Sequence, residues 1–350
     1  MNIQHVILIT PGFTADEYDR NCLPTLQLYV EALLAQNIAV HVVALDYPFS
    51  NKVYPWKGAQ VYPCGGRNSR WLKPRTIWRA LKICKRLVKE TPPGTAVALH
   101  SFWLGWASGI GERIAKQLQV RHITTLMGQD VLPQNRHRFK FITRERQERL
   151  VVLSNFQNEV LENQSGYKAA QVIPWGVSGV EIPAVFAQNR PIDILGAGSL
   201  IPLKNWDLWL ETIAIVAKKY PELKALLLGS GPEKQRLESR AQQLGLSKIV
   251  EFAGELSRPQ VLEKMQQAKV LLHTSSFESQ GYVLSEAAMN GCRVVGTPVG
   301  IAPEMGACAN KAEALAILVR KALGATLLVE ADTPYLMSDT VRAYIKLYRD

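Results

Sequence analysis

Two carboxylates lie where the sequence predicts a strand, a loop and a helix in succession. Residues 270–273 form a short apolar run, typical of a buried parallel strand, and residues 282–290 have helical composition. Glu278 therefore lies in the loop and Glu286 in the first turns of the helix. In open α/β sheets such loops bind ligands, because free helix amides attract phosphate. A helix carboxylate there can accept both hydroxyls of a ribose, and a loop carboxylate can reach a sugar.

The same stretch resembles a known family. Residues 277–291 read F-E-x-x-G-Y-x-L-x-E-A-x-x-x-G, which is similar to the Glu-x7-Glu signature of retaining glycosyltransferases of family 4. The resemblance implies a GT-B fold, with two Rossmann-like, doubly wound parallel-sheet domains facing across a cleft. It implies that Glu278 is a catalytic residue that contacts the donor sugar and that Glu286 binds the ribose of the donor. Further donor contacts are expected from Gly281, Tyr282 and Val283. The alternative is an ordinary βαβ unit with two incidental acids.

Two further segments of the second half carry the resemblance. Residues 198–205 resemble the family's Gly-Arg-Leu-x-x-x-Lys-Gly, with Lys204 at the lysine and Ser199 where the family has arginine. We therefore expect Lys204 to stabilise a diphosphate leaving group as a catalytic residue, and Ser199 to contact the donor. Residues 252–256 resemble the segment beside the nucleobase, where Gly254 is expected to make a donor contact.

The first half matches the family more loosely. The apolar strand at residues 6–10 runs into Gly12, at the position of a flexible glycine loop, and we expect Gly12 to contribute to donor binding. Residues 125–130 are similar to the family's Thr-x-His-Gly-x-Asp, with Asp130 as a donor contact and Met127 where the histidine would be. His100 ends a neighbouring predicted strand and could fill part of that space as a catalytic residue. A structural histidine is the alternative.

The alternation of predicted elements indicates two domains. Strands near 193–199, 224–229, 249–253, 270–274 and 293–296 alternate with helical segments, which is typical of a parallel doubly wound sheet. We expect an acceptor-binding domain over residues 1–182 and a nucleotide-sugar-binding domain over 190–325, joined by a linker near 183–191. Residues 326–350 are expected to form a tail helix that packs back on the first domain.

Composition excludes several classes of protein. Of the 350 residues 47% are hydrophobic and 20% charged, with no apolar run long enough to span a membrane. The five cysteines show no Cys-x-x-Cys spacing, so reduced thiols in a cytoplasmic protein are expected rather than disulfides or a zinc site. Residues 1–180 hold 22 Lys and Arg against 12 Asp and Glu, a net of +10 out of +11 for the chain. This asymmetry favours an anionic partner for the first half.

Much of that charge clusters within residues 67–89. Apolar residues at 77, 81, 84 and 88 predict the core face of a helix, and basic residues at 75, 79, 82, 86 and 89 its opposite face. Trp71 and Trp78 border the basic stripe. A solvated face is one interpretation. Contact with anionic lipid on the inner membrane face, or with an acidic acceptor, is the other.

The resemblance implies a hexosyltransferase, and the composition is compatible with it. It would transfer a sugar from a nucleotide diphosphate sugar to a glycan or lipid-linked acceptor with retention of configuration. No Asp-x-Asp motif is present, and neither a metal, a cofactor nor nucleic acid is expected as a partner. A nucleotide-sugar epimerase and a non-catalytic nucleotide-sugar-binding protein remain alternatives. A nicotinamide-dependent oxidoreductase is disfavoured, because no strand leads into Gly-x-Gly-x-x-Gly.

Overall fold

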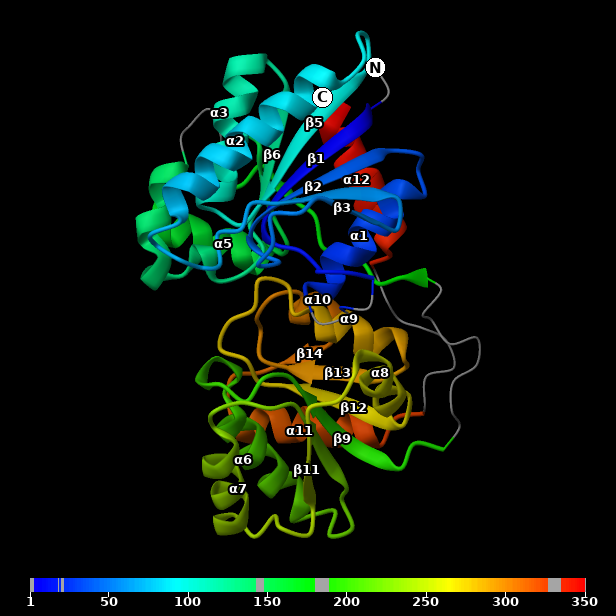
Figure 1. Ribbon diagram of the computed structural model, residues 1–350. Helices are drawn as coiled ribbons and strands as arrows, with labels where there is room; N and C mark the ends of the chain where they lie inside the picture. Colours follow the sequence, from blue (N-terminus) through cyan, green and yellow to red (C-terminus); the bar gives the residue numbers. More distant parts are fainter. Residues whose placement is uncertain are drawn as a thin grey trace. The chain divides into compact units, whose positions relative to one another are not determined.

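The structure of the protein is a computed structural model that describes residues 3–17, 19, 22–142, 148–179, 189–326 and 335–349 (Figure 1). The chain divides into two units, one formed by Met1–Trp175 with Met337–Asp350, the other by Gly176–Leu336. The first unit thus ends a few residues before the boundary expected at 182. Most of the linker expected at 183–191 lies outside the described residues.

The first unit is built on an eight-stranded sheet in the order β3-β4-β2-β1-β5-β6-β7-β8. All neighbouring strands are parallel except β3 and β4. The strands are β1 (Ile3–Gly12), β2 (Ala39–Tyr47), β3 (Tyr54–Trp56), β4 (Ala59–Pro63), β5 (Ala96–Phe102), β6 (Arg121–Thr125), β7 (Leu150–Val152) and β8 (Gln171–Val172).

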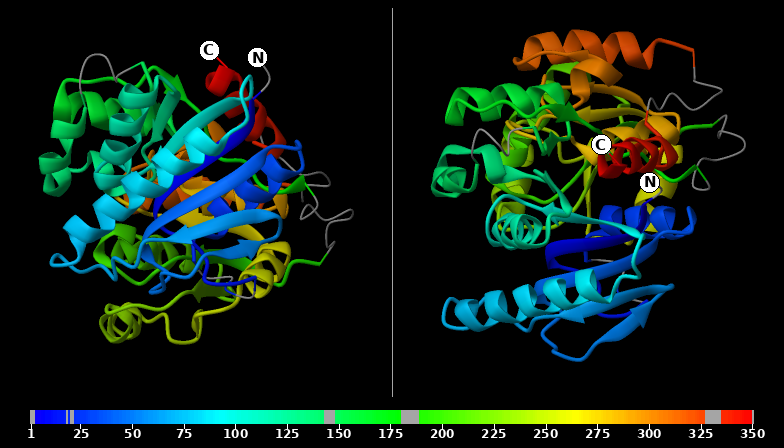
Figure 2. Two further views of the ribbon diagram at one scale, coloured as in Figure 1. Left: turned by 45° about the horizontal axis from the view of Figure 1, so that its top comes forward. Right: turned by 90° about the horizontal axis from the view of Figure 1, so that it is seen from above.

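Helices cover both faces of this sheet. One face carries α2 (Lys73–Glu90) and α3 (Trp106–Leu118), which pack on apolar residues of β1, β2 and β5. The other carries α1 (Pro24–Leu34) and the terminal helix α12 (Met337–Arg349), which lie side by side in Figures 1 and 2. The helix α5 (Asn155–Ser165) and the 3-10 helices η1 (Gln129–Val131) and η2 (Pro133–Phe141) contact one another near the carboxyl ends of the strands.

The hairpin β3–β4 corrects a sequence prediction. Residues 47–70 show no clear hydrophobic period, which predicts a surface excursion without regular structure, but the hairpin extends the sheet, and Trp56 is fully buried. Its turn is Lys57-Gly58, and both residues have positive φ (46° and 99°). Such two-residue turns match the twist of antiparallel strands. In the sequence, only the Lys57-Gly58 turn indicates this hairpin, and a search for apolar periodicity does not detect a turn.

The core face of α2 lies close to the predicted one but is rotated about the helix axis. Its fully buried side chains are those of Thr76, Ala80, Cys84 and Leu87. Of the four predicted core residues, only Cys84 is among them, and the other three are partly buried. The rotation arises because α2 packs against both β2 and α3, so that its buried face lies between these two contacts.

The second unit contains a six-stranded parallel sheet in the order β11-β10-β9-β12-β13-β14. The five predicted strands are confirmed as β9 (Ile192–Ala197), β10 (Ala225–Leu228), β11 (Val250–Gly254), β12 (Ala268–His273) and β13 (Arg293–Gly296); β14 (Ala307–Cys308) was not predicted. Along the chain the order runs outward from β9 to β11 and then returns to the other side of β9 with β12. The point between β9 and β12 is therefore the topological switch point of this sheet.

Helices again cover both faces. One face packs on α6 (Trp206–Ala217), α7 (Lys234–Gln243) and α11 (Ala312–Leu323). The other packs on α8 (Arg258–Gln266), α9 (Tyr282–Met289) and α10 (Ala302–Met305). The short 3-10 helix η4 (Pro202–Lys204) follows β9. This arrangement leaves the carboxyl ends of β9, β10 and β12 to loops.

A buried hydrogen-bonded network ties α12 to the first unit. The Tyr348 hydroxyl lies 2.6 Å from both the Nδ1 atom of His100 and the hydroxyl of Tyr29. The Nε2 atom of His100 lies 2.8 Å from the Thr125 hydroxyl, which in turn lies 2.8 Å from the Tyr344 hydroxyl. Both tyrosines of α12 therefore satisfy polar groups that would otherwise be buried without partners. The expected tail helix belongs to the first unit through these contacts.

Replacing Tyr348 by Phe should destabilise the first unit by about 1–3 kcal/mol, because the substitution leaves His100 and Tyr29 with unsatisfied buried polar groups. Urea unfolding measures the loss. The control is Tyr220→Phe, at a partly buried tyrosine of the second unit, which should shift the free energy of unfolding by less than about 0.5 kcal/mol. Equal shifts for the two variants would contradict the structural role of this network.

Candidate active site

A cavity of about 480 Å³ lies in the second unit where β9, β10 and β11 end and α9 begins. It includes the loops on both sides of the switch point, where open α/β sheets bind ligands. The lining residues include five that the sequence predicted as site residues, namely Ser199, Lys204, Gly281, Tyr282 and Val283, together with the predicted catalytic residue Glu278.

Two glycines allow the backbone to form this cavity. A Cβ atom on Gly229, after β10, would lie 1.9 Å from the carbonyl oxygen of Gly198, after β9. Only glycine permits these two strand ends to approach so closely. Gly281 precedes α9 with a φ of +82°, a left-handed conformation that side chains rarely adopt. The N-terminus of α9 is thereby directed at the cavity, where its dipole favours anions.

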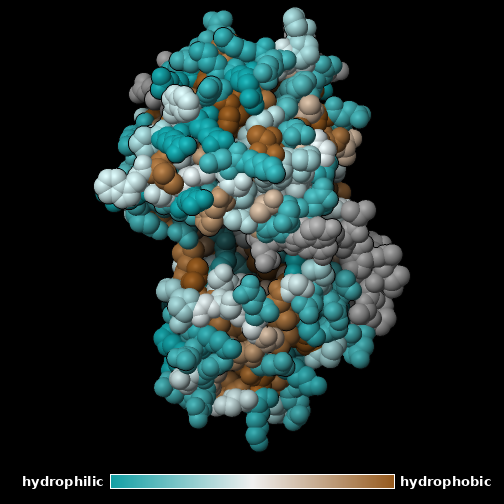
Figure 3. All heavy atoms as spheres, in the orientation of Figure 1, coloured by the Kyte–Doolittle hydropathy of each residue, from teal (hydrophilic) through white to brown (hydrophobic). Residues whose placement is uncertain are grey.

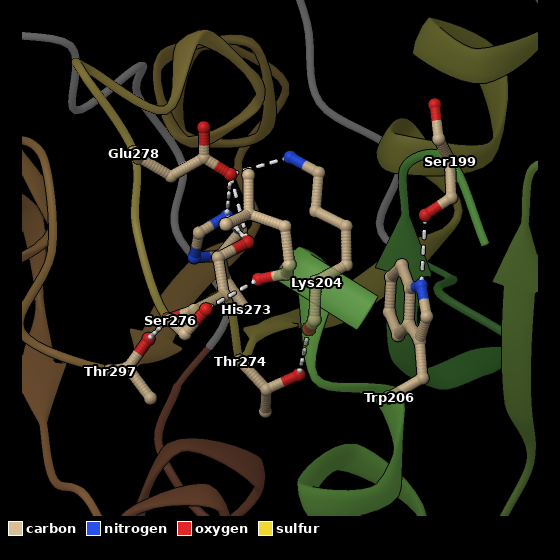
Figure 4. Close-up of polar contacts among 10 residues, drawn as sticks. Ser199, Lys204, Trp206, His273, Thr274, Ser276, Glu278 and Thr297 are labelled. Carbon is tan, nitrogen blue, oxygen red and sulfur yellow. Dashed lines mark hydrogen bonds and ion pairs between the residues drawn. The ribbon is translucent and has the colours of Figure 1, made fainter. Parts of the chain in front are cut away.

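The centre of the site is an ion pair across the switch point (Figure 4). The ammonium of Lys204, which follows β9, lies 2.5 Å from Oε1 of Glu278, which follows β12. The same oxygen accepts a hydrogen bond of 2.8 Å from the Ser275 hydroxyl and lies 3.2 Å from Nε2 of His273. His273 and Ser275 were not predicted as site residues. The signal for them was the presence of polar residues at the carboxyl end of a buried strand.

These partners keep Glu278 ionised. Burial alone would raise the pKa of its carboxyl group, but the hydrogen bond with His273 and the charge of Lys204 outweigh burial and lower the pKa to about 2. The Thr274 hydroxyl donates to the Lys204 carbonyl, and the Ser276 hydroxyl to the Leu203 carbonyl, so the loops after β9 and β12 are fixed to one another. The geometry supplies a cation of fixed position beside a carboxylate that is ionised at neutral pH.

Glu286 lies one helical turn inside α9, and a second ion pair holds it. Its Oε1 atom accepts a 3.0 Å hydrogen bond from Nε of Arg258, at the start of α8. Leu256 and Val261, on either side of Arg258 in the sequence, both line the cavity. Arg258 is thus a third residue that sequence reasoning missed, since a single arginine at a helix start carries no recognisable pattern.

Other predicted donor contacts occupy the rim. Ser199 is exposed, and its carbonyl accepts a 3.0 Å hydrogen bond from Nε1 of Trp206 (Figure 4). Gly254 ends β11 with a φ of +73°, and its carbonyl accepts from the amide of Gly229. Glu255, the next residue, lines the cavity and accepts a 2.8 Å hydrogen bond from the Ser230 hydroxyl. The donor roles of Ser199 and Gly254 stay predictions.

Two predicted site residues of the first unit are corrected by their surroundings. The catalytic role of His100 is wrong, because its side chain is fully buried and both ring nitrogens are hydrogen-bonded in the α12 network. Burial also lowers the pKa of His100 well below its ordinary value. Asp130 is 1% exposed and bonds Arg138 and the amide of Met127, so the predicted direct donor contact is wrong as well. Both residues stabilise the fold.

Gly12 ends β1 beside Tyr47, and its predicted donor contact stays a prediction. A second cavity, of about 380 Å³, lies near this strand end within the first unit. Its lining combines aromatic rings with cationic and polar groups, including Trp103, Trp106, Lys73, Asn68, His137, Arg138 and Lys140. Lys73 is held by Asp46 at 3.0 Å and Arg138 by Asp130 at 3.2 Å. Such a lining suits a ligand with a sugar ring and an anionic group.

Comparison with known proteins supports a shared family for part of the chain. Residues 181–315 match the family model described as "Glycosyl transferases group 1". A human phosphatidylinositol N-acetylglucosaminyltransferase subunit is 31% identical over 150 residues, which are 43% of this chain and 31% of the relative. The D-inositol 3-phosphate glycosyltransferase of Streptomyces coelicolor is 32% identical over 118 residues, 31% of this chain and 26% of the relative. The chain therefore matches about a quarter to a third of the length of these relatives.

Solved structures match nearly the whole chain. The S. aureus protein TarM, in a complex with UDP, superimposes with a TM-score of 0.69 at 11% identity, covering 99% of this chain and 100% of that one. The sucrose-phosphate synthase of Thermosynechococcus elongatus gives a TM-score of 0.68 at 19% identity, covering 99% and 94%. The fold is GT-B. This confirms the predicted fold class of two Rossmann-like, parallel-sheet units.

The ion pair predicts how stability depends on pH. Because folding lowers the pKa of Glu278 from 4.5 to about 2, its stabilising contribution is complete above pH 4.5 and is lost as the pH falls towards 2. The difference in the free energy of unfolding between the wild type and Glu278→Gln should therefore be constant above about pH 5 and narrow between pH 4.5 and 3. Urea unfolding at each pH measures it, with Glu238→Gln, an exposed residue of α7, as the control. A difference that does not change over this range would contradict the assigned ion pair.

Proposed function

We propose that this protein is a retaining glycosyltransferase that moves a hexosyl group from a nucleotide diphosphate sugar to a glycan or lipid-linked acceptor. The observation that carries the proposal is the pair Lys204–Glu278, held across the switch point at the N-terminus of α9. A fixed cation and a helix N-terminus suit a departing diphosphate, and a fixed carboxylate suits a sugar. The match of residues 181–315 to group 1 glycosyltransferases supports the same conclusion.

In this proposal Lys204 and α9 bind the diphosphate of the donor. The ammonium of Lys204 would exchange part of its contact with Glu278 for a phosphate oxygen, and the start of α9 would face the other oxygens. Since Ser199 stands in the place of an arginine, Lys204 is the main side-chain cation of this loop. Neither a metal ion nor a cofactor is required in the proposed reaction.

The reaction itself follows from these positions. An acceptor hydroxyl attacks the anomeric carbon on the face from which the diphosphate leaves, so that the configuration is retained. The bond between the anomeric carbon and the phosphate oxygen breaks, and the departing phosphate takes the proton of the acceptor hydroxyl. Lys204 stabilises the charge that develops on the phosphate. Glu278, ionised at neutral pH, orients the hydroxyls of the donor sugar.

Glu286 is proposed to bind the ribose of the nucleotide. A carboxylate offers about four acceptor positions. The hydrogen bond from Arg258 fixes the orientation in which this carboxylate would meet the ribose hydroxyls. Glu255 and Ser230, at the end of the cavity formed by β10 and β11, are proposed to contact the nucleobase.

The acceptor is proposed to bind the cavity of the first unit at the ends of β1, β2 and β5. Its aromatic rings suit a sugar face, and Lys73, His137 and Lys140 suit a phosphate. Two of the relatives are named for phosphatidylinositol and D-inositol 3-phosphate, both phosphate-bearing compounds. The surface at residues 67–89 would bring the enzyme to an anionic membrane on its cytoplasmic side.

Product analysis with a labelled donor tests the function. The protein is incubated with a panel of labelled nucleotide diphosphate sugars and with phosphate-bearing glycan and lipid acceptors. Transfer of label to an acceptor, with the anomeric configuration of the donor, is the expected result. Release of an epimerised nucleotide sugar would support an epimerase instead. Saturable donor binding without any product would support a nucleotide-sugar-binding protein and contradict the proposal.

Lys204→Ala should lower turnover by more than about tenfold, because the loop then has no side-chain cation for the leaving phosphate. The matched control is Lys248→Ala, at an exposed lysine of the same unit away from the cavity, which should retain wild-type turnover. Introducing the family residue with Ser199→Arg should partly restore the Lys204 variant. Wild-type turnover in Lys204→Ala would remove this lysine from the mechanism.

Substitutions of Glu286 and Glu278 should affect nucleotide binding and turnover to different extents. Glu286→Ala should weaken nucleoside diphosphate binding, because two ribose hydroxyls lose a charged acceptor worth about 1.5–3 kcal/mol per hydrogen bond at most. Glu278→Ala should impair turnover more than nucleoside diphosphate binding. Calorimetry gives the affinities and initial rates give the turnover. If Glu286→Ala binds the nucleotide as tightly as the wild type, the ribose assignment is wrong.

A further inference from the structure

A cationic cavity of about 420 Å³ lies in the first unit between α2 and the hairpin β3–β4, apart from the cavity proposed for the acceptor. The two cavities share no lining residue. Four cations of α2 line it, Arg75, Arg79, Lys82 and Arg86, and Tyr62, Pro63 and Val53 form the opposite wall. Since no carboxylate is among the described lining residues, the cavity concentrates positive charge.

The four cations are mostly held by neutral groups. Arg79 donates a 2.8 Å hydrogen bond to the carbonyl of Asn51, which fixes the guanidinium against the segment before the hairpin. Arg86 lies over the ring of Tyr62 and Lys82 over the ring of Trp78. Within the described part of the chain, Arg86 alone of the four pairs with a carboxylate, Glu90 at 3.7 Å, and both side chains are more than half exposed. Four cations in one cavity repel each other unless an anion enters.

Exposed apolar side chains line this cavity or lie in the chain segments next to its lining residues. Trp78 lines it and is 63% exposed, and Val53 lines it and is 47% exposed. Trp71, two residues before the start of α2, is 93% exposed. Phe49, in the segment leading to the hairpin, is 53% exposed. In Figure 3 hydrophilic surface dominates this side of the first unit, interrupted by pale and brown patches. Exposed tryptophans beside cations are typical of protein surfaces that enter a membrane interface.

We propose that this cavity binds the phosphate-bearing headgroup of an anionic membrane lipid, with Trp71, Trp78, Phe49 and Val53 inserted in the interface around it. The phosphate would contact Arg75 and Lys82, the two lining cations that neither donate to a carbonyl nor pair with a carboxylate among the described contacts. The inference rests on the membrane contact of the proposed function and gives it a defined binding site. Among the residues that the structure describes, no helix is long and apolar enough to cross a bilayer.

A membrane lipid explains both the cluster of cations in this cavity and the exposed apolar side chains near it. A soluble phosphate compound would account for the cations but not for the exposed side chains of Trp78 and Val53 in the cavity lining, nor for the exposed Trp71 and Phe49 in the adjoining segments. A purely electrostatic attraction to the bilayer would need only net charge, which residues 67–89 supply along the whole helix. The cavity adds a specific position, because the hairpin wall and Arg79 fix its shape.

Vesicle co-sedimentation tests the site with two charge-matched variants. Arg75→Gln with Lys82→Gln removes two charges from the cavity, and Lys85→Gln with Lys89→Gln removes two exposed charges of the same helix outside it. The wild type should bind phosphatidylglycerol vesicles and ignore phosphatidylcholine vesicles. The cavity variant should lose more than tenfold in affinity for the anionic vesicles and the control variant less than threefold. Equal losses would reduce the site to general electrostatic attraction and overturn the proposal.

Two further arms separate the source of the phosphate and the role of the donor. Trp78→Ala should weaken vesicle binding severalfold, and soluble glycerol phosphate at the same concentration as the lipid should not displace the protein. Displacement by glycerol phosphate, or no binding to either vesicle, would contradict a lipid site. Lys204→Ala should bind vesicles like the wild type, and the cavity variant should bind nucleoside diphosphate like the wild type. These variants therefore test the lipid site and the donor site separately, so that either proposal can be contradicted while the other stands.

Discussion

The ion pair between Lys204 and Glu278 is the interaction on which the candidate site depends. Each residue follows a different strand at the switch point, and each would be costly to bury without the other. The site therefore requires β9 and β12 to be neighbours, and its cavity requires Gly229, where the chain after β10 passes close to Gly198 after β9. His273 and Ser275 complete the pair by satisfying the same oxygen of Glu278. The order of the strands brings Lys204 and Glu278 together, and their ion pair keeps the Glu278 carboxylate ionised.

Much of the second unit could be predicted from the sequence, because its signals are local. Apolar runs of four to six residues bounded by turns located β9 to β13, and the helical composition of residues 282–290 located α9. Lys204, Gly281 and Tyr282 were assigned to one site from separate motifs, and all three line the same cavity. Arg258 and His273 were missed because their partners are distant in the sequence or because a strand-end histidine carries no pattern of its own.

The first unit was harder to predict for physical reasons. His100 has the residue type and the position of a catalytic group, but α12 covers it from 248 residues further along the chain. Asp130 matches a motif, yet its carboxylate caps a loop and pairs with Arg138. Apolar periodicity did not predict the hairpin β3–β4, because the feature that specifies this hairpin is its turn Lys57-Gly58. In each case a contact made only in the folded chain decides the role of the residue. The basic stripe of α2 was visible in the sequence, but the cavity that it lines depends on the hairpin.

The central claim is that the ammonium of Lys204 pairs with Glu278 in the unliganded protein and binds the distal phosphate of the donor in the complex. Calorimetry of nucleoside diphosphate against nucleoside monophosphate, for the wild type and Lys204→Ala, tests this most directly. The account predicts that the wild type prefers the diphosphate by at least about tenfold, equivalent to about 1.4 kcal/mol. In the variant this preference should fall to near one while the affinity for the monophosphate changes little. A preference for the diphosphate that persists in Lys204→Ala would contradict the account.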